Sequence, residues 1–304
     1  MDSLSYVLIT PARNESRYIE KTLESMIRQT VLPRKWVIVN DGSTDNTASL
    51  VAKYLAAHPW IEMIDLPVHR DRSFAGKVHA FNAGLERVKN LEYEVIGNLD
   101  ADLSFDPDYC EFLLQKFALD ASLGVAGTAF EENGYNSATD SFEGQNHVAG
   151  GCQLFRRQCF EQIGGYVPNR AGGIDWIAVT TARMLGWKTR SFREKFFFHY
   201  RSLGTAERGL LASAFSYGEK DYYLGNHPLW EMFRVAYRAT KKPYMLAALA
   251  IYSGYLSAAL RRMRRPVSRE LMRFHRREQM LKLQSILKRR LSFRRVDNFE
   301  VTPS

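Results

Sequence analysis

An α/β fold with a mostly parallel central sheet is predicted from three observations on the first hundred residues. Short runs rich in apolar residues alternate with stretches whose apolar residues recur at helical spacing. Each run is followed by a polar or proline-containing turn. Four strands separated by three helices imply right-handed crossovers and helices on both faces of the sheet. The expected strands are 6–9, 36–39, 60–64 and 95–99, and the expected helices include 19–27, 50–55 and 78–88.

The first two strands end in turns that favour helix starts. Tyr6–Ile9 is a β-branched run that stops before Pro11, and helical apolar spacing begins after Ser16. Trp36–Val39 ends in Asn40–Ser43, whose residue types favour a tight turn that opens a helix. Ligands bind beyond the carboxyl ends of the strands in sheets of this kind, so we expect the functional residues in these turns.

The middle of the chain, roughly residues 103–225, is less regular, and no internal repeat is visible there. The same patterns predict helices, an aromatic strand and a polar loop in this part. The expected helices are 155–163 and 176–185, the strand is 195–199 and the loop is 131–145.

The net charge of +9 is concentrated near the C-terminus. Residues 261–295 hold fourteen Lys and Arg against two Glu, or +12, whereas residues 1–260 hold 28 basic and 29 acidic residues, or −1. With 45% hydrophobic and 25% charged residues, the composition excludes wholesale disorder. We expect one domain over residues 1–225 and a helical, basic C-terminal region over residues 226–304.

Cysteine content and the N-terminus both favour a cytoplasmic setting. The three cysteines are too few and too unevenly spaced for a disulfide framework or a zinc site, so they are expected to be reduced thiols. The N-terminus lacks the basic and apolar segments of a signal peptide.

Two aspartates directly follow the apolar strand 95–99. Asp100 and Asp102 flank Ala101, and residues two apart in an extended chain face the same side. Converging carboxylates repel each other unless a cation lies between them, and a hard divalent ion that also binds phosphate oxygens suits them. The alternative is a solvated acidic turn, because a single D-x-D motif is common.

Four polar or glycine-containing motifs follow one another in this half of the chain: Pro11–Glu15, Asn40–Asp45, Gly76–Gly84 and Asp100–Asp102. The order of these motifs resembles family 2 glycosyltransferases, which have the Rossmann-like GT-A fold and use nucleotide-diphosphate sugars. The resemblance covers roughly residues 5–205. It is specific for the family and says little about the sugar.

The resemblance implies roles for the donor-binding residues. Pro11, Arg13 and Glu15 would border the nucleotide, although many relatives have an aromatic residue at the position of Arg13. Asp41 would accept hydrogen bonds from the base or ribose, and Lys77 would contact phosphate or sugar. Read from the residues alone, Asp41 is also suited to a turn and Lys77 to a solvated helix start.

The Asp100-Ala101-Asp102 motif would bind the donor, with Asp102 serving the metal, Mg²⁺ or Mn²⁺, and Asp100 acting less directly. His199 and Arg201, at the end of an aromatic strand, match a His-x-Arg that relatives often carry near the diphosphate. His199 would be a metal ligand or a donor to phosphate, and Arg201 a charge clamp. A histidine that ends an apolar strand is equally often structural.

The segment Gly173-Ile174-Asp175-Trp176 looks like the family's Glu-Asp motif, with Ile174 in place of the usual acid. An inverting transfer needs a single base to remove the acceptor proton, so Asp175 alone suffices. The paired glycines Gly150-Gly151 allow a close backbone approach to a ligand. The alternative role for Asp175 is an ordinary helix N-cap.

An uncharged stretch of eighteen residues, 243–260, lies between Lys241-Lys242 and Arg261-Arg262. It is short for a membrane span, and cations on both sides argue against a simple crossing. A helix or re-entrant segment lying at the inner membrane surface is expected, with the basic region 261–295 attracted to anionic lipids. The alternatives are a buried core helix and a merely solvated basic helix. Nucleic-acid binding is disfavoured, because no recognised module is present.

The sequence therefore predicts an inverting, metal-dependent glycosyltransferase at the cytoplasmic face of the cell membrane. Its acceptor is expected to be a lipid-linked or cell-surface polysaccharide intermediate. A nucleotidyltransferase would need a Gly-rich phosphate loop where Pro11–Glu15 stands. A membrane-bound scaffold with a degenerate transferase domain is conceivable because of Ile174. The nucleotide, the sugar and the acceptor stay open.

Overall fold

The computed structural model describes residues 4–69, 74–140, 144–169, 172–201, 209–239 and 245–291. The chain divides into two compact units, Met1–Arg201 and Ser202–Ser304. Each unit is described by itself below.

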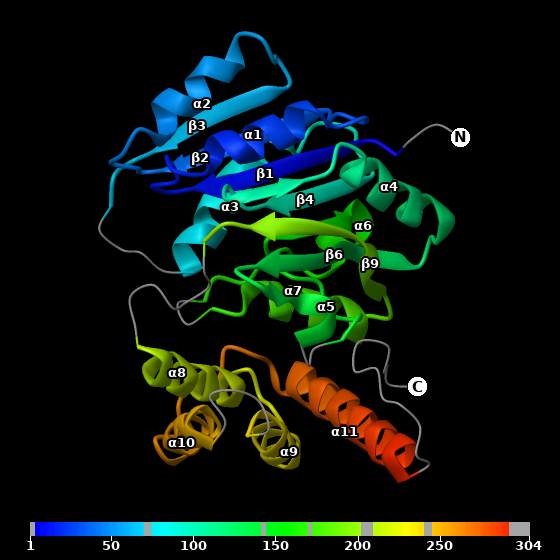
Figure 1. The fold of residues 1–304 in the computed structure, drawn as a ribbon. Coiled ribbons are helices and arrows are strands. Elements are labelled where there is room, and N and C mark those ends of the chain that lie inside the picture. The colour runs from blue at the N-terminus through cyan, green and yellow to red at the C-terminus, as the bar shows by residue number, and fades with distance from the viewer. Residues whose placement is uncertain are drawn as a thin grey trace. The chain divides into compact units, whose positions relative to one another are not determined.

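The described part of the first unit contains a nine-stranded sheet flanked by helices (Figure 1). The strand order is β3-β2-β1-β4-β8-β6-β9-β5, and β7 pairs with β6. The strands are β1 (Tyr6–Ala12), β2 (Lys35–Asp41), β3 (Ile61–Leu66), β4 (Val95–Leu99), β5 (Leu103–Phe105), β6 (Leu123–Glu132), β7 (Tyr135–Asn136), β8 (Cys152–Arg156) and β9 (Lys188–His199). The helices are α1 (Ile19–Ile27), α2 (Thr47–Leu55), α3 (Phe74–Val88), α4 (Tyr109–Leu119), α5 (Ser137–Asp140), α6 (Arg157–Gln162) and α7 (Ile174–Met184).

The first four strands are parallel, as the alternation of strand and helix signals predicts. β1 lies between β2 and β4, and β3 pairs with the outer side of β2. Each strand returns through a helix, so the carboxyl ends of β1, β2 and β4 meet at one edge of the sheet. The polar turns predicted to carry function lie at this edge.

The second half of the sheet is mixed. β8 is antiparallel to both β4 and β6, whereas β9 is parallel to β6 and antiparallel to β5. The helix predicted over 155–163 is wrong at its start, because Phe155 and Arg156 belong to β8 and α6 begins at Arg157. Phe155 also falls at helical spacing with Cys159, and such a short apolar segment fits both periodicities. Phe155 and Arg156 form a strand because β8 pairs with β4 on one side and with β6 on the other.

The loop predicted over 131–145 is only partly a loop. β6 continues through Glu132, β7 adds a short strand and α5 follows it. Residues 141–143 lie outside the described residues. A hairpin with polar side chains has a weak strand pattern, so its residue types favour a loop prediction.

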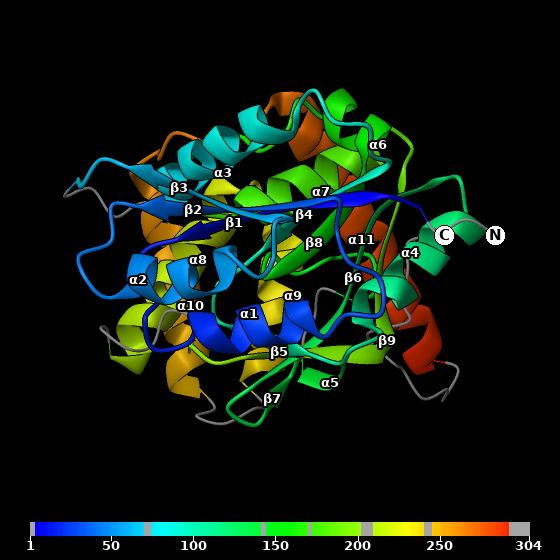
Figure 2. The ribbon, with the colours of Figure 1, turned by 90° about the horizontal axis from the view of Figure 1, so that it is seen from above.

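Helices cover both faces of the sheet (Figure 2). Apolar side chains fill the layers between the sheet and these helices. On one face, Tyr6 and Leu8 of β1 pack in the same cluster as residues of α1, α2 and α4. On the other face, Val7 and Ile9 pack with residues of α3, α6 and α7. This alternation along β1 buries both sides of the strand, and the resulting rigid layers fix the positions of the loops at the sheet edge.

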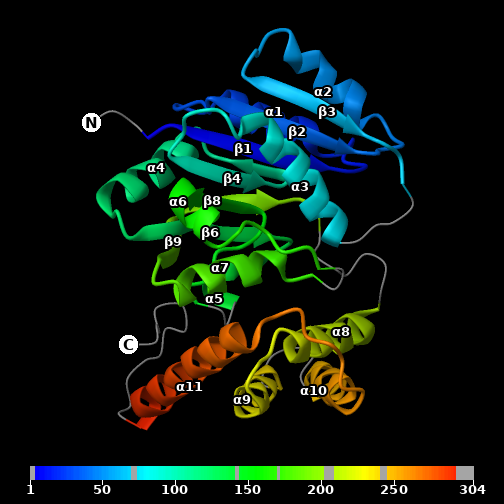
Figure 3. The same cartoon turned by 180° about the vertical axis from the view of Figure 1, so that it is seen from behind.

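The described part of the second unit is helical (Figure 3). Its helices are α8 (Leu210–Tyr223), α9 (Pro228–Arg238), α10 (Met245–Leu260) and α11 (Arg269–Leu291). The predicted boundary between residues 225 and 226 falls between α8 and α9, so the division into 1–225 and 226–304 stays a prediction. Lys241, Lys242, Arg294 and Arg295 of the predicted basic segments lie outside the described residues.

Close backbone contact joins α8 to α10. A Cβ atom added to Gly218 would lie 1.8 Å from the carbonyl oxygen of Ile251, and one added to Gly254 would lie 2.0 Å from that of Phe215. Only glycine permits this approach. Along the described chain, we find no helix with both the length and the apolar character needed to cross a membrane.

Candidate active site

The turn after β4 is held in place by backbone hydrogen bonds from two directions. The amide of Asp100 donates to the carbonyl of Gly151 at 2.8 Å, and the amide of Tyr200 donates to the carbonyl of Asp102 at 3.0 Å. Ala101 is buried in the apolar core, so the two flanking carboxylates lie on the other side of the chain. The strand end therefore presents both aspartates toward one place, as the D-x-D spacing predicts.

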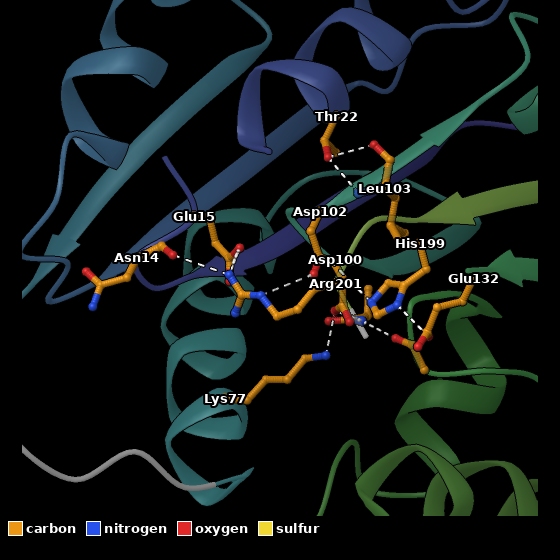
Figure 4. A network of polar contacts seen from close by, with 12 residues as sticks. Asn14, Glu15, Thr22, Lys77, Asp100, Asp102, Leu103, Glu132, His199 and Arg201 are labelled. Carbon is orange, nitrogen blue, oxygen red and sulfur yellow. Dashed lines mark hydrogen bonds and ion pairs between the residues drawn. The ribbon is translucent and has the colours of Figure 1, made fainter. Parts of the chain in front are cut away.

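The segment just after this turn is tied to α1. The hydroxyl of Thr22 accepts a hydrogen bond from the amide of Leu103 at 3.0 Å and donates to its carbonyl at 2.8 Å (Figure 4). Both hydrogen bonds are buried, so they fix the chain directly after Asp102 and limit movement of the Asp102 carboxylate.

Asp100, Asp102 and His199 form a cluster whose ligand atoms all lie within 4.8 Å of one another. The Nε2 atom of His199 is 3.5 Å from a carboxylate oxygen of Asp102. Two carboxylates and an imidazole suit Mn²⁺ well, and the oxygens also suit Mg²⁺. These three residues fit a divalent cation, and they include both of the predicted metal ligands.

Lys77, near the start of α3, lies against the same carboxylates. Its Nζ atom is 2.5 Å from Oδ1 of Asp100, which also accepts from Asn98 at 3.2 Å. Burial works against a charged lysine, but the charge of Asp100 outweighs it and raises the pKa of Lys77. Burial, joined by the like charge of Asp102, raises the pKa of Asp100 even though Lys77 opposes the shift.

His199 is held between two acids. Its Nδ1 atom is 3.0 Å from Oε2 of Glu132, while Nε2 faces Asp102 (Figure 4). Burial lowers the pKa of His199, but the hydrogen bonds and charges of Asp102 and Glu132 outweigh it and raise the pKa to about 9. A carboxylate on one ring nitrogen directs the other nitrogen toward a metal. Glu132 thereby orients His199.

Arg201 connects the end of β9 to the turn after β1. It forms an ion pair with Glu15, donates to the carbonyl of Asn14 at 3.3 Å and places Nε 3.8 Å from Asp102 (Figure 4). Glu15 is 9% exposed, so its charge needs this partner. This contact brings together Glu15 and Arg201, which the sequence analysis predicts for the donor site.

The turn that carries Glu15 is fastened to the turn after β2. Asn14 has a positive φ of 55° and its amide donates to the hydroxyl of Ser43 at 3.0 Å. The amide of Glu15 donates to Thr47 at 2.8 Å, and Asp45 accepts from the amide of Ser16 at 3.0 Å. These three hydrogen bonds join the turn after β1 to the turn after β2 and to the start of α2.

Asp41 at the end of β2 is contacted by a histidine that the sequence analysis did not single out. Nε2 of His69 is 2.9 Å from Asp41, and Nδ1 of His69 is 3.2 Å from a guanidinium nitrogen of Arg13. Arg13 also donates to the backbone carbonyl of His69. His69 follows β3 in a segment without a recognisable pattern, although a histidine beyond a strand end is a weak signal of a ligand contact.

Asp175 stands in the first turn of α7, and Pro11 lies on β1 opposite Val39 of β2. The N-cap of α7 is Gly173, with φ of 76°, so Asp175 is not the ordinary N-cap that the sequence left as an alternative. A Cβ atom on Gly150 would lie 2.9 Å from the Asp175 carboxylate. The glycine therefore makes room for this acid, whose charge also contributes to the raised pKa of Lys77.

The fold is that of GT-A proteins, and the candidate site lies at the carboxyl ends of its strands. Two solved structures share the fold: a mannosyltransferase from Pyrobaculum calidifontis in complex with GDP-Man and Mn²⁺, and TarS of S. aureus in complex with UDP-GlcNAc. The TM-scores are 0.57 and 0.56, at 19% and 16% identity. The likeness covers 94% of this chain and 80% of the former, and 97% of this chain and 89% of the latter.

Residues 7–141 match the family described as Glycosyl transferase family 2. Poly-beta-1,6-N-acetyl-D-glucosamine synthase of Staphylococcus epidermidis is 31% identical over 125 residues, which are 41% of this chain and 28% of that protein. Chondroitin synthase of Pasteurella multocida is 32% identical over 135 residues, which are 41% of this chain and 13% of that protein. The chain thus matches only about a quarter of the length of the first of these relatives.

Proposed function

We propose that this protein transfers a sugar from a nucleoside-diphosphate sugar to a hydroxyl group of a glycan acceptor. The observation that carries the proposal is the convergence of Asp100, Asp102 and His199 at the carboxyl edge of the sheet, with Lys77 and Arg201 beside them. Carboxylates that hold a cation, together with the positively charged side chains beside them, suit a diphosphate. The match of residues 7–141 to Glycosyl transferase family 2 supports sugar transfer as the reaction.

The donor would bind along the ends of β1, β2 and β4. Asp41 would accept hydrogen bonds from the base or ribose, while Pro11, Arg13 and Glu15 would border the nucleotide. Arg13 lies in hydrogen-bond contact with His69, which in turn contacts Asp41, so these groups form one polar wall. The complexes of similar proteins with GDP-Man and UDP-GlcNAc support a nucleotide-sugar donor.

A divalent cation, Mg²⁺ or Mn²⁺, held by Asp102 and His199 with Asp100, would neutralise charge on the diphosphate as it leaves. Lys77 and Arg201 supply further positive charge to the phosphate oxygens. Asp175 would remove the proton from the acceptor hydroxyl, which attacks the anomeric carbon from the face opposite the nucleotide and inverts its configuration. The space left by Gly150 beside Asp175 supports this role.

The acceptor is proposed to be a lipid-linked or cell-surface polysaccharide intermediate at the cytoplasmic face of the cell membrane. Two observations support it. The relatives include synthases of extended polysaccharides. The C-terminal region also has a strong positive charge, which attracts anionic lipid headgroups.

The test is a screen of nucleotide sugars with Mn²⁺ or Mg²⁺, read as release of the nucleoside diphosphate. Asp102→Asn and Asp175→Asn keep the side-chain shape and remove the charge, so each should lower turnover by about a hundredfold or more. Asp108→Asn is the matched control, because Asp108 contacts Lys195 instead of the site. Full turnover in both site variants contradicts the proposal. Nucleotide binding without turnover of any donor by the natural protein favours the scaffold alternative.

A further inference from the structure

One side of α10 exposes a row of large apolar side chains that is interrupted once, at Ser253. Of the exposed positions on this helix, only Ser253 is polar. The exposed fractions range from 41% at Leu256 to 84% at Leu260. Positions 246, 249, 253, 256 and 260 recur every three or four residues, so they lie along one face. We call Met245, Leu246, Leu249, Leu256 and Leu260 the α10 stripe.

The opposite side of α10 is already used for packing within the second unit. Ala247, Ile251 and Ala258 are buried there, and Gly254 allows the close contact with α8. Apart from the exposed Ser253 and the half-buried Tyr252 and Ser257, the helix is therefore apolar around its circumference. A helix at a protein–water boundary normally has a polar outer face, whereas an all-apolar helix is covered by protein or lipid. The α10 stripe consequently needs a further partner.

The length of α10 determines how lipid could cover it. Its 16 residues extend about 24 Å at 1.5 Å per residue, which is shorter than the bilayer core of about 30 Å. A helix of this length suits a position in the plane of the interface, with its apolar side toward the acyl chains. α9 also exposes Leu229 and Met232, one turn apart on its surface.

Charge selects lipid over a second copy of the chain. Arg261, Arg262 and Arg264 directly follow the α10 stripe and are exposed. Residues 261–290 hold twelve Lys and Arg against two Glu, or +10, and the Lys241-Lys242 pair precedes the helix in the sequence. A second copy packed on the stripe in either direction would bring like charges together. An anionic headgroup layer would neutralise them.

The basic helix α11 offers no comparable apolar row, because Leu287 is the one exposed large apolar side chain among its described positions. Leu271 and Ile286 are buried at 4% and 1% exposure, in a row that includes His275, Gln279 and Lys282. This helix therefore contributes charge, and the surface that can enter lipid lies on α10.

We propose that α10 lies in the headgroup region of an anionic bilayer, with the α10 stripe among the acyl chains and Arg262 and Arg264 at the lipid phosphates. This proposal rests on the proposed membrane-face placement and names the surface responsible. It chooses the surface-lying arrangement from those that the sequence left open for residues 243–260.

The test is sedimentation of the full chain with vesicles of phosphatidylcholine alone or with 30% phosphatidylglycerol. The natural protein should bind the anionic vesicles much more tightly, and salt should weaken the binding. Leu249→Glu combined with Leu256→Glu should weaken it by about a hundredfold, because both side chains leave the lipid. Leu119→Glu is the matched control, since Leu119 is an exposed leucine of the first unit.

A second variant tests the charge separately. Arg262→Ser with Arg264→Ser should weaken binding to anionic vesicles by about fivefold for each arginine. Unchanged binding of the double glutamate variant overturns the proposal. The proposal is also overturned if the natural protein does not bind vesicles and instead forms a dimer, measured by light scattering, that the double glutamate variant does not form. Asp175→Asn should bind vesicles normally while losing transfer, so failure of the catalytic proposal and failure of this one are distinguishable.

Discussion

Glu132 should control metal affinity through His199, although it is not itself in the Asp100–Asp102–His199 cluster. Its carboxylate is 3.0 Å from Nδ1 of His199, and the side chains of Glu132 and His199 are only 13% and 7% exposed. Glu132→Ala removes the carboxylate that accepts a hydrogen bond from Nδ1 of His199, so this buried ring N–H loses its acceptor. Glu132→Gln keeps an oxygen that accepts from Nδ1 and removes only the charge.

The expected loss in Mn²⁺ affinity for Glu132→Ala is tenfold to a hundredfold, or about 1.4–2.7 kcal/mol, the usual effect of losing a carboxylate behind a metal-bound histidine. Glu132→Gln should fall between the natural protein and the alanine variant. The loss should be measured near pH 9, because the pKa of His199 in the metal-free protein is about 9. At lower pH a proton competes with the metal for the ring.

The pH dependence gives a second readout. In the natural protein, Mn²⁺ affinity should rise by about tenfold per pH unit between pH 7 and pH 9, as one proton is displaced. In Glu132→Ala the pKa of His199 loses one of the interactions that raise it, so the slope should flatten at lower pH.

Binding is measured by electron paramagnetic resonance of free Mn²⁺ under anaerobic conditions. Glu131→Gln is the matched control, because Glu131 contacts Asn136 on the neighbouring strand. If Glu132→Ala binds Mn²⁺ like the natural protein at both ends of this pH range, the role assigned to Glu132 is refuted. An equal loss in the Glu131 control has the same consequence.

Three further changes test other parts of the molecule. Lys77→Met should lower kcat for donor cleavage at least tenfold in steady-state assays, because a cation beside the carboxylates is lost. Asn226→Ala should destabilise the second unit by about 3 kcal/mol in chemical denaturation, because the fully buried Glu231 loses its hydrogen bond from Asn226. Asp45→Ala should cost about 1 kcal/mol above pH 4 and nothing below pH 2, in thermal melts across this range. Although burial opposes it, hydrogen bonds from Thr47 and Ser16 lower the pKa of Asp45 from 3.8 to about 2, so its contribution disappears as pH falls through that value.

The first half of the fold was predictable because its information is local. The strand ending at Leu99 and the two aspartates after it are adjacent in the sequence, and a parallel sheet brings such strand ends to one edge. The proximity of Lys77 to Asp100 follows from the same crossover. No long-range pairing had to be guessed for these residues.

Glu132 and His69 escaped prediction for the opposite reason. Glu132 meets His199 across 67 residues of sequence, through the pairing of β6 with β9. Glu132 belongs to a polar segment that resembles a loop, and strand register cannot be read from such a segment. His69 reaches Asp41 from a segment after β3 that carries no periodicity. Asp175 was found only through the family resemblance, and Gly173 at the N-cap was needed to separate it from a capping residue.

The charges of the site explain why these long-range contacts matter. Asp100 pairs with Lys77, Glu15 with Arg201, and His199 lies between Asp102 and Glu132. Without a metal, a protonated His199 offsets the repulsion between carboxylates that a cation would otherwise relieve. A divalent ion held by Asp100, Asp102 and His199 would supply positive charge in place of that proton, so Lys77 and Arg201 would stabilise the two aspartates less. We therefore expect Lys77 and Arg201 to become available to the diphosphate when a metal is bound. Metal and donor should then bind cooperatively. Lys77→Met should weaken this cooperativity more than it weakens Mn²⁺ binding alone.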